Sequence, residues 1–223
     1  MISSCVPNAA IPPLPLTIPD QILSPDSGAV LARQLAPVLY LQRDERFRLE
    51  RAVAVLHPER HIIAYHLLWQ DDAHGAWLPF TKGTDQEILW VGYDRSGAPT
   101  DLWTYWHGAI LHADWRGKGQ IVANVQWGKH GTLPRGVEEA DLPALQSLTS
   151  FYFYAWVIPD LWLGSLVREG PQCFCHGLGR YRQFTTPVVL GRRLDAIVRT
   201  ANPDRALSVV FGGDYSRKPE WPN

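Results

Sequence analysis

The most regular pattern along the chain is the alternation of residues 61–69 (HIIAYHLLW), whose two faces are both largely apolar. β-Branched and aromatic residues with a period of two are typical of a strand, and two apolar faces indicate that the strand is covered on both sides. This segment therefore predicts a central strand of a sheet. Shorter alternating runs predict further strands over 38–41, 87–93, 102–107, 111–115 and 120–127.

Two glycine-containing turns indicate how these strands connect. Residues 94–97 (DRSG) separate two of the strands, and Gly97 suits a turn position with positive φ, so a hairpin is predicted there. Residues 117–119 (GKG) separate the next two strands and suggest that those strands also pair. The fold class that follows is mainly β, an antiparallel β-sandwich with peripheral helices.

The two ends of the chain have a different character. Prolines crowd residues 1–25, which predicts an extended arm, and residues 26–223 are expected to form a single β-sandwich domain with C-terminal helices. Capping residues and apolar spacing predict helices over 26–35, 141–155 and 192–200, and a last strand over 207–211.

Composition limits the possible functions. The 223 residues are 46% hydrophobic and 19% charged, with a net charge of −1 and no massed basic segment, so nucleic acid is not an expected partner. No apolar run is long enough to predict a transmembrane segment, and the N-terminal residues lack the pattern of a signal peptide, which leaves the localisation open. Cys5, Cys173 and Cys175 permit one disulfide and a spare thiol, or soft metal ligands.

Acidic residues gather around one strand entry. Asp71, Asp72 and His74 lie in a predicted loop, and Asp85 and Glu87 follow at the start of an extended segment. Residues i and i+2 of a strand point to the same side, so two carboxylates would repel each other there unless a cation lay between them. The pattern predicts a divalent metal site for Mg²⁺, Ca²⁺ or Mn²⁺, with Zn²⁺ less favoured.

The histidines divide into two groups. His107 and His130 lie at predicted strand ends beside glycines, where the backbone can approach a ligand closely, so both are candidates for a site. His66 lies among apolar neighbours in a predicted strand and is interpreted as a hydrogen-bonded core residue. His57, His61 and His112 are interpreted as structural or solvent-facing.

Aromatic residues raise two further possibilities. Residues 151–167 are rich in Phe, Tyr and Trp, which indicates either a helix and turn packed on a sheet or an element that contacts a membrane. Ten tryptophans allow a carbohydrate-binding interpretation, although strand packing accounts for most of their positions. Neither a serine nucleophile elbow nor a phosphate-binding glycine loop occurs in the sequence.

Several short motifs resemble, in order and spacing, two related groups of proteins. One is the vacuolar-sorting-associated-like group of bacteria, fungi and plants, and the other is the necrosis- and ethylene-inducing-like proteins. The resemblance covers about residues 35–136. The motifs are 35–41 (LAPVLYL), 44–45 (DE), 69–72 (WQDD), 83–88 (GTDQEI), 105–108 (YWHG) and 128–131 (GKHG).

The resemblance implies a β-sandwich with peripheral helices, and for the necrosis-inducing group a divalent cation held by a Gly-His-Arg-His-Asp-Trp-Glu motif. By position, Asp85 and Glu87 match the acids of that motif, Asp71 or Asp72 matches an upstream aspartate, and His130 matches a downstream histidine. This chain departs from the motif at three positions, where the family has two histidines and a tryptophan. Those positions hold Lys82, Thr84 and Gln86, and the lysine could partly replace the cation.

Three hypotheses follow. The first is a divalent-cation site made by Asp71, Asp72, Asp85, Glu87 and His130, which binds or processes a small polar ligand or glycan. Metal-dependent hydrolysis is included, with Glu87 and His130 as candidate catalytic residues and His74, Lys82 and His107 as ligand-pocket candidates. The second is a secreted, membrane-damaging protein that binds a lipid head group, and the resemblance slightly favours secretion. The third is a carbohydrate-binding or structural module without catalysis.

Overall fold

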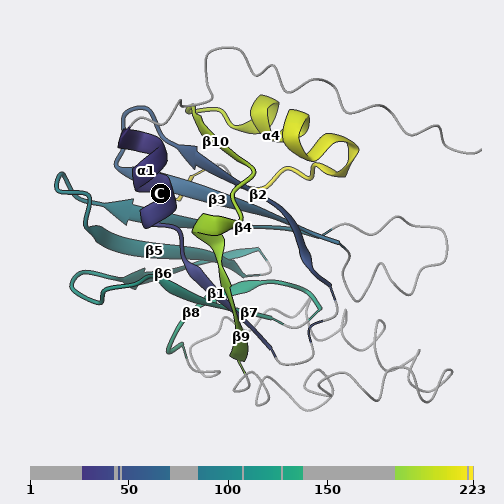
Figure 1. Cartoon of the computed structure of the whole chain (residues 1–223), viewed down its shortest axis with the longest axis horizontal. Coiled ribbons are helices and arrows are strands. Elements are labelled where there is room, and N and C mark those ends of the chain that lie inside the picture. Colours follow the sequence, from purple (N-terminus) through teal and green to yellow (C-terminus); the bar gives the residue numbers. More distant parts are fainter. Residues whose placement is uncertain are drawn as a thin grey trace, which may run out of the picture.

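In the computed structural model, two β-sheets face each other and short helices lie at their margins (Figure 1). The structure describes residues 27–42, 45, 47–70, 85–106, 108–126, 128–137, 184–219 and 221–222. The expected arm over 1–25, the helix over 141–155 and the aromatic segment over 151–167 lie outside the described residues.

The larger sheet has six strands in the order β10-β2-β3-β4-β5-β6. Its bounds are β2 Leu49–Leu56, β3 Ile62–Trp69, β4 Asp85–Tyr93, β5 Pro99–Trp106, β6 Ala109–Asp114 and β10 Ala196–Arg199. The smaller sheet has the order β8-β7-β1-β9. It consists of β1 Val38–Gln42, β7 Val122–Val125, β8 Thr132–Pro134 and β9 Phe184–Val189.

Two apolar layers hold these elements together. The main core lies between the sheets, and it is lined by the side chains of Ile63, Tyr65, Leu67 and Trp69 on one face of β3. The helix α1 (Ser27–Gln34) adds Ala29 and Ala32 to this core, together with Leu35 and Ala36 just after it. The Tyr65 hydroxyl donates a hydrogen bond of 2.8 Å to the Ala32 carbonyl, which ties the helix to the sheet.

The opposite face of the six-stranded sheet is covered by α4 (Asp204–Phe211). Leu207 and Phe211 of this helix pack against Val53, Val55 and Trp90 of the sheet. Short 3₁₀ turns follow β9 and α4, at Leu190–Arg192 (η6) and Gly212–Asp214 (η7). Both faces of β3 and β4 are therefore buried, as the two-sided apolar pattern predicts.

Most of the expected elements are confirmed. The fold is a mainly β sandwich with peripheral helices, and its described strand pairs are antiparallel except for β1 with β7 and β10 with β2. The strands expected over 61–69, 87–93 and 102–107 are β3, β4 and β5, and the turn at 94–97 has Gly97 at φ 83°. The first helix and β1 also lie where the pattern places them.

The expected pairing across residues 117–119 is wrong. Gly117 and Gly119 do have positive φ values of 71° and 73°, so the turn itself is present. However, β6 pairs with β5 at the edge of the large sheet, whereas β7 pairs with β1 and β8 in the other sheet. The turn carries the chain from one layer to the other, which alternation within each strand cannot reveal.

The two elements expected near the C-terminus are also wrong, because a strand lies where a helix was expected and a helix lies where a strand was expected. The predicted helix over 192–200 is instead the strand β10, whose Ile197 and Val198 favour an extended backbone and pair in parallel with β2. The predicted strand over 207–211 is instead α4. Its buried residues follow helical spacing on one face, and they are Ala206, Leu207, Val210 and Phe211.

Candidate functional site

His130 lies in a tight turn after β7 and is fully buried. Its φ of 54° is left-handed, which is uncommon for a residue with a side chain. The turn is closed by hydrogen bonds from the His130 amide to the Gln126 carbonyl (3.0 Å) and from the Gln126 amide to the Gly131 carbonyl (2.9 Å). A Cβ atom at Gly131 would lie 3.0 Å from the Trp106 ring, so glycine allows the turn to approach that tryptophan.

Two aromatic side chains hold the His130 ring. The indole of Trp69, at the end of β3, stacks on it with a centroid distance of 4.2 Å and an interplanar angle of 8°. The Phe47 ring meets it edge-on at 6.0 Å. A charged imidazolium is stabilised by the negative face of an indole ring, so this packing suits the protonated histidine.

Two carboxylates flank the same ring, one at each nitrogen. His130 Nδ1 lies 2.9 Å from Asp85 Oδ2, and His130 Nε2 lies 3.5 Å from Glu45 Oε1. Glu45 is itself fixed, because its oxygens accept hydrogen bonds from the backbone amides of Phe47 (3.0 Å) and Gly128 (2.9 Å). We call Glu45, Asp85 and His130 the histidine cluster.

The carboxylates determine the charge of His130. Burial alone would lower the pKa of the imidazole, but the hydrogen bonds and charges of Asp85 and Glu45 outweigh it and raise the pKa to about 9. The effect on Glu45 is reciprocal. Burial alone would raise the pKa of Glu45. His130 and the two backbone amides lower it by a larger amount, so the net pKa falls below the ordinary value of 4.5. His130 is therefore a buried cation between two carboxylates near neutral pH.

Glu87 lies next to this cluster on β4. Glu87 is paired with Leu67, and Asp85 is paired with Trp69. Leu67 and Trp69 belong to the core between the sheets, so both acids face that core, on one side of the strand as the i and i+2 spacing predicts. Glu87 Oε1 lies 3.7 Å from the Lys218 ammonium, which also lies over the Tyr105 ring. Burial raises the pKa of Glu87 and the Asp85 charge adds to the rise, although Lys218 and His130 oppose it.

The arrangement bears on the predicted metal site. Two carboxylates on one strand face were expected to need a cation, and His130 and Lys218 supply positive charges there. His130 Nδ1 is hydrogen-bonded to Asp85, whereas Nε2 lies within ion-pair distance of Glu45 without a hydrogen bond to it. Within the described residues, no group of three histidine, cysteine or acidic side chains is placed to hold an ion. Divalent-cation binding stays a prediction.

The structure brings together Asp85, Glu87 and His130 from the predicted set. The other candidates lie outside the described residues, and they are Asp71, Asp72, His74, Lys82 and His107. Glu45 and Lys218 also contact these residues, and neither was predicted as a site residue. Glu45 belongs to one of the short motifs quoted above, whereas Lys218 has no distinguishing sequence signal.

The remaining histidines largely agree with their interpretation. His66 is buried, and burial lowers its pKa to about 3, so it is a neutral core residue. Its expected hydrogen bond is absent among the described residues. His112 Nε2 lies 2.8 Å from Asp101 Oδ1 on the exposed side of β5 and β6. His57 and His61 line a surface pocket at the other end of β3.

The fold and the histidine cluster define a β-sandwich with a buried, charge-compensated group at one end of its central strands. No protein-family model matches the chain, and no curated protein matches it. Solved structures that are similar to it include "NLPPya in complex with glucosamine" and "NLPPya in complex with mannosamine". Both are 14% identical with a TM-score of 0.38, and they cover 51% and 54% of this chain and 71% and 74% of their own.

NLPPya is a necrosis- and ethylene-inducing-like protein, so the likeness is to one of the two groups named above. At this level of identity and structural overlap, nothing about that protein's ligands carries over to the histidine cluster. Among the described residues, no helix is both long and apolar enough to cross a bilayer.

Proposed function

We propose that this protein binds a small polar ligand through the carboxyl groups of Asp85 and Glu87. The observation that carries the proposal is the Glu87 side chain, which is buried while its Oε2 atom has no hydrogen-bond partner among the described residues. An unsatisfied buried polar atom costs roughly 1–3 kcal/mol, and a ligand that donates a hydrogen bond to it would recover much of that cost.

The neighbouring contacts engage one oxygen of each acid. Lys218 approaches Oε1 of Glu87, so Oε2 is the atom left to a ligand. Asp85 uses Oδ2 to hold His130, and its side chain remains 14% exposed, so solvent reaches this carboxylate. His130 is a positioning residue in this proposal, because it orients Asp85 and is itself inaccessible.

The chemistry of the acids indicates the ligand class. A partly exposed carboxylate attracts a cation, and a carboxyl oxygen in a buried position favours an N–H or O–H donor. An ammonium group beside hydroxyl groups satisfies both requirements, and glucosamine is a small probe that carries them. Glucose has the same hydroxyls without the charge and is the matched control ligand.

Calorimetric titration and thermal unfolding of the full chain test the proposal. At a glucosamine concentration ten times the dissociation constant, binding to the folded state alone adds about 1.4 kcal/mol, or roughly 3–6 °C in melting temperature. Asp85→Asn and Glu87→Gln should each remove the shift. Glu50→Gln changes an exposed acid of β2 and should keep it.

The same titration separates the alternatives. If neither glucosamine nor any divalent cation shifts the wild type, the proposed binding site is refuted. If Ca²⁺, Mg²⁺ or Mn²⁺ raises the melting temperature and glucosamine does not, the ligand is the metal that the sequence predicts, and Asp85→Asn should abolish that effect. Turnover of a substrate and action on membranes stay predictions.

A further inference from the structure

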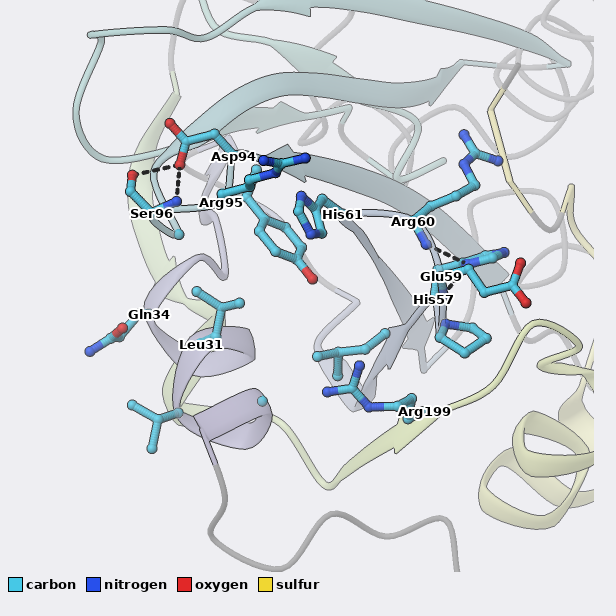
Figure 2. Close-up of a pocket in the computed structure, with 16 residues that line it drawn as sticks. Leu31, Gln34, His57, Glu59, Arg60, His61, Asp94, Arg95, Ser96 and Arg199 are labelled. Atoms are coloured by element: carbon cyan, nitrogen blue, oxygen red, sulfur yellow. Dashed lines mark hydrogen bonds between the residues drawn. The ribbon is translucent and has the colours of Figure 1, made fainter.

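A concave site lies at the opposite end of the large sheet from the histidine cluster. It is a pocket of about 620 Å³ between α1, the turn that joins β2 to β3, the turn that joins β4 to β5, and Arg199 at the end of β10 (Figure 2). The strand β3 runs from beside the pocket residue His61 to Trp69, and a strand of eight residues spans roughly 25 Å. The two sites are therefore independent in space.

Both turns that form the pocket are fixed by their own side chains. The ring nitrogen Nδ1 of His57 accepts hydrogen bonds from the backbone amides of Glu59 (3.1 Å) and Arg60 (3.0 Å). Asp94 Oδ1 accepts from the amides of Ser96 (2.8 Å) and Ala98 (3.0 Å). These bonds to Oδ1 hold the Asp94 carboxylate against its own turn.

One wall of the pocket is aromatic and apolar. The rings of His61 and Tyr93 stack with a centroid distance of 5.1 Å and an interplanar angle of 22°. Leu31 of α1 faces them, and a Cβ atom at Gly97 would lie only 3.2 Å from its Cδ1, so the turn and the helix are in close contact. Flat rings beside an aliphatic side chain form a surface on which a ligand ring can pack.

The charged side chains of the pocket are predominantly basic. Arg60, Arg95 and Arg199 line it, against the acids Glu59 and Asp94. Arg60 donates one hydrogen bond to the Pro222 carbonyl (2.9 Å). The side chains of Arg95 and Arg199 have no hydrogen bond or ion pair with another described residue, and Figure 2 shows them on different sides of the pocket. Two guanidinium groups are thus available to a ligand.

We infer that this pocket binds a phosphate monoester of a ring compound. Guanidinium groups present paired N–H donors that match phosphate oxygens, and two of them on different sides can hold a dianion between them. The His61–Tyr93 stack would support the ring of the same molecule. The volume lies within the range of small-molecule pockets, roughly 300–1,000 Å³. Sugar phosphates and nucleotides share this chemistry, and the test distinguishes them.

The test is calorimetric titration of the full chain with glucose 6-phosphate, adenosine monophosphate and inorganic phosphate, and with glucose and adenosine as uncharged controls. At least one phosphate ester should bind more tightly than its uncharged counterpart by about tenfold or more, and added salt should weaken it. The ester that binds better identifies the ring. Inorganic phosphate should bind more weakly than that ester, because it lacks the ring.

Exposed arginines supply the variants and their control. Arg95→Gln and Arg199→Gln should each weaken binding of the preferred ester by about tenfold, since each removes one charge-assisted contact. Arg192→Gln changes an exposed arginine of η6 outside the pocket and should leave the affinity within about twofold. Asp85→Asn should also leave it unchanged, which separates this pocket from the site proposed above. Equal binding by the wild type and the Arg95→Gln/Arg199→Gln double variant, or no preference for the esters, would overturn the inference.

Discussion

The charge of His130 makes the stability of this protein depend on pH in a defined window. The pKa of the histidine is about 9 in the folded protein and 6.5 without the fold, so the folded state holds the proton more tightly. The stabilisation is fully present below pH 6.5 and is lost as the pH rises through 9. A rise from 6.5 to about 9, at about 1.4 kcal/mol per pH unit, corresponds to roughly 3 kcal/mol.

Glu87 changes stability in the same direction but over a wider range. Its pKa is raised in the folded protein, mainly by burial, so its contribution also declines with rising pH, but the decline begins near 4.5. The Glu87→Gln variant removes this second source. In that background, the loss of stability that begins above pH 6.5 belongs to His130.

Guanidinium unfolding of the Glu87→Gln background at pH 6.0, 7.5 and 9.5 measures the effect. The free energy of unfolding should fall by roughly 3 kcal/mol between the first and last of these values. Adding His130→Asn, which tolerates a left-handed backbone, should flatten the dependence and cost about 3–5 kcal/mol at pH 6.0, because two carboxylates lose their cation.

His112→Asn in the same background is the control, since His112 is an exposed histidine paired with Asp101. It should keep the dependence. An equal fall in stability with and without His130 would refute the assignment of the buried positive charge to this residue.

Two further predictions concern packing. Gly191→Ala should destabilise the protein by about 1–3 kcal/mol, since a Cβ atom there would lie 2.4 Å from the Arg33 carbonyl oxygen. Gly213→Ala is the control, because a Cβ atom there meets nothing within 4 Å and should change stability little. Thermal unfolding compares the two variants. Tyr65→Phe should cost about 1 kcal/mol of stability by removing the hydrogen bond to Ala32. Tyr40→Phe is its control, because the Tyr40 hydroxyl makes no such bond to a described residue. Equal effects within either pair of variants would contradict the stated contact.

Local sequence patterns predict the centre of this fold well. The run of residues 61–69 is that of β3, because a strand buried on both faces is apolar at nearly every position, here with His66 as the buried exception. The last 30 residues are harder, since short apolar runs suit either a strand or a helix. Val210 and Phe211 become helical because α4 covers the outer face of the large sheet, and that contact is not a local property.

The candidate site shows the same limit. Asp85 and Glu87 could be placed on one face from their spacing alone, and His130 from its glycine neighbours. Glu45 could not be joined to His130 from spacing, because the two residues meet only when β1 pairs in parallel with β7, which is remote in the sequence. Positive charges do lie beside these acids, and distant parts of the chain supply them, from His130 and from Lys218.

The order of the strands has a consequence for how the chain reaches this structure. Strands β2 to β6 are neighbours both in sequence and in the large sheet, so each pairing closes a loop of at most 15 residues. The small sheet depends on remote partners, since Val38 pairs with Val122 on one side and with Val189 on the other. Closing long loops is entropically costly and slows folding. The meander from β2 to β6 can therefore assemble first, and β1 can gain both neighbours only when the segments that carry β7 and β9 have come back across it.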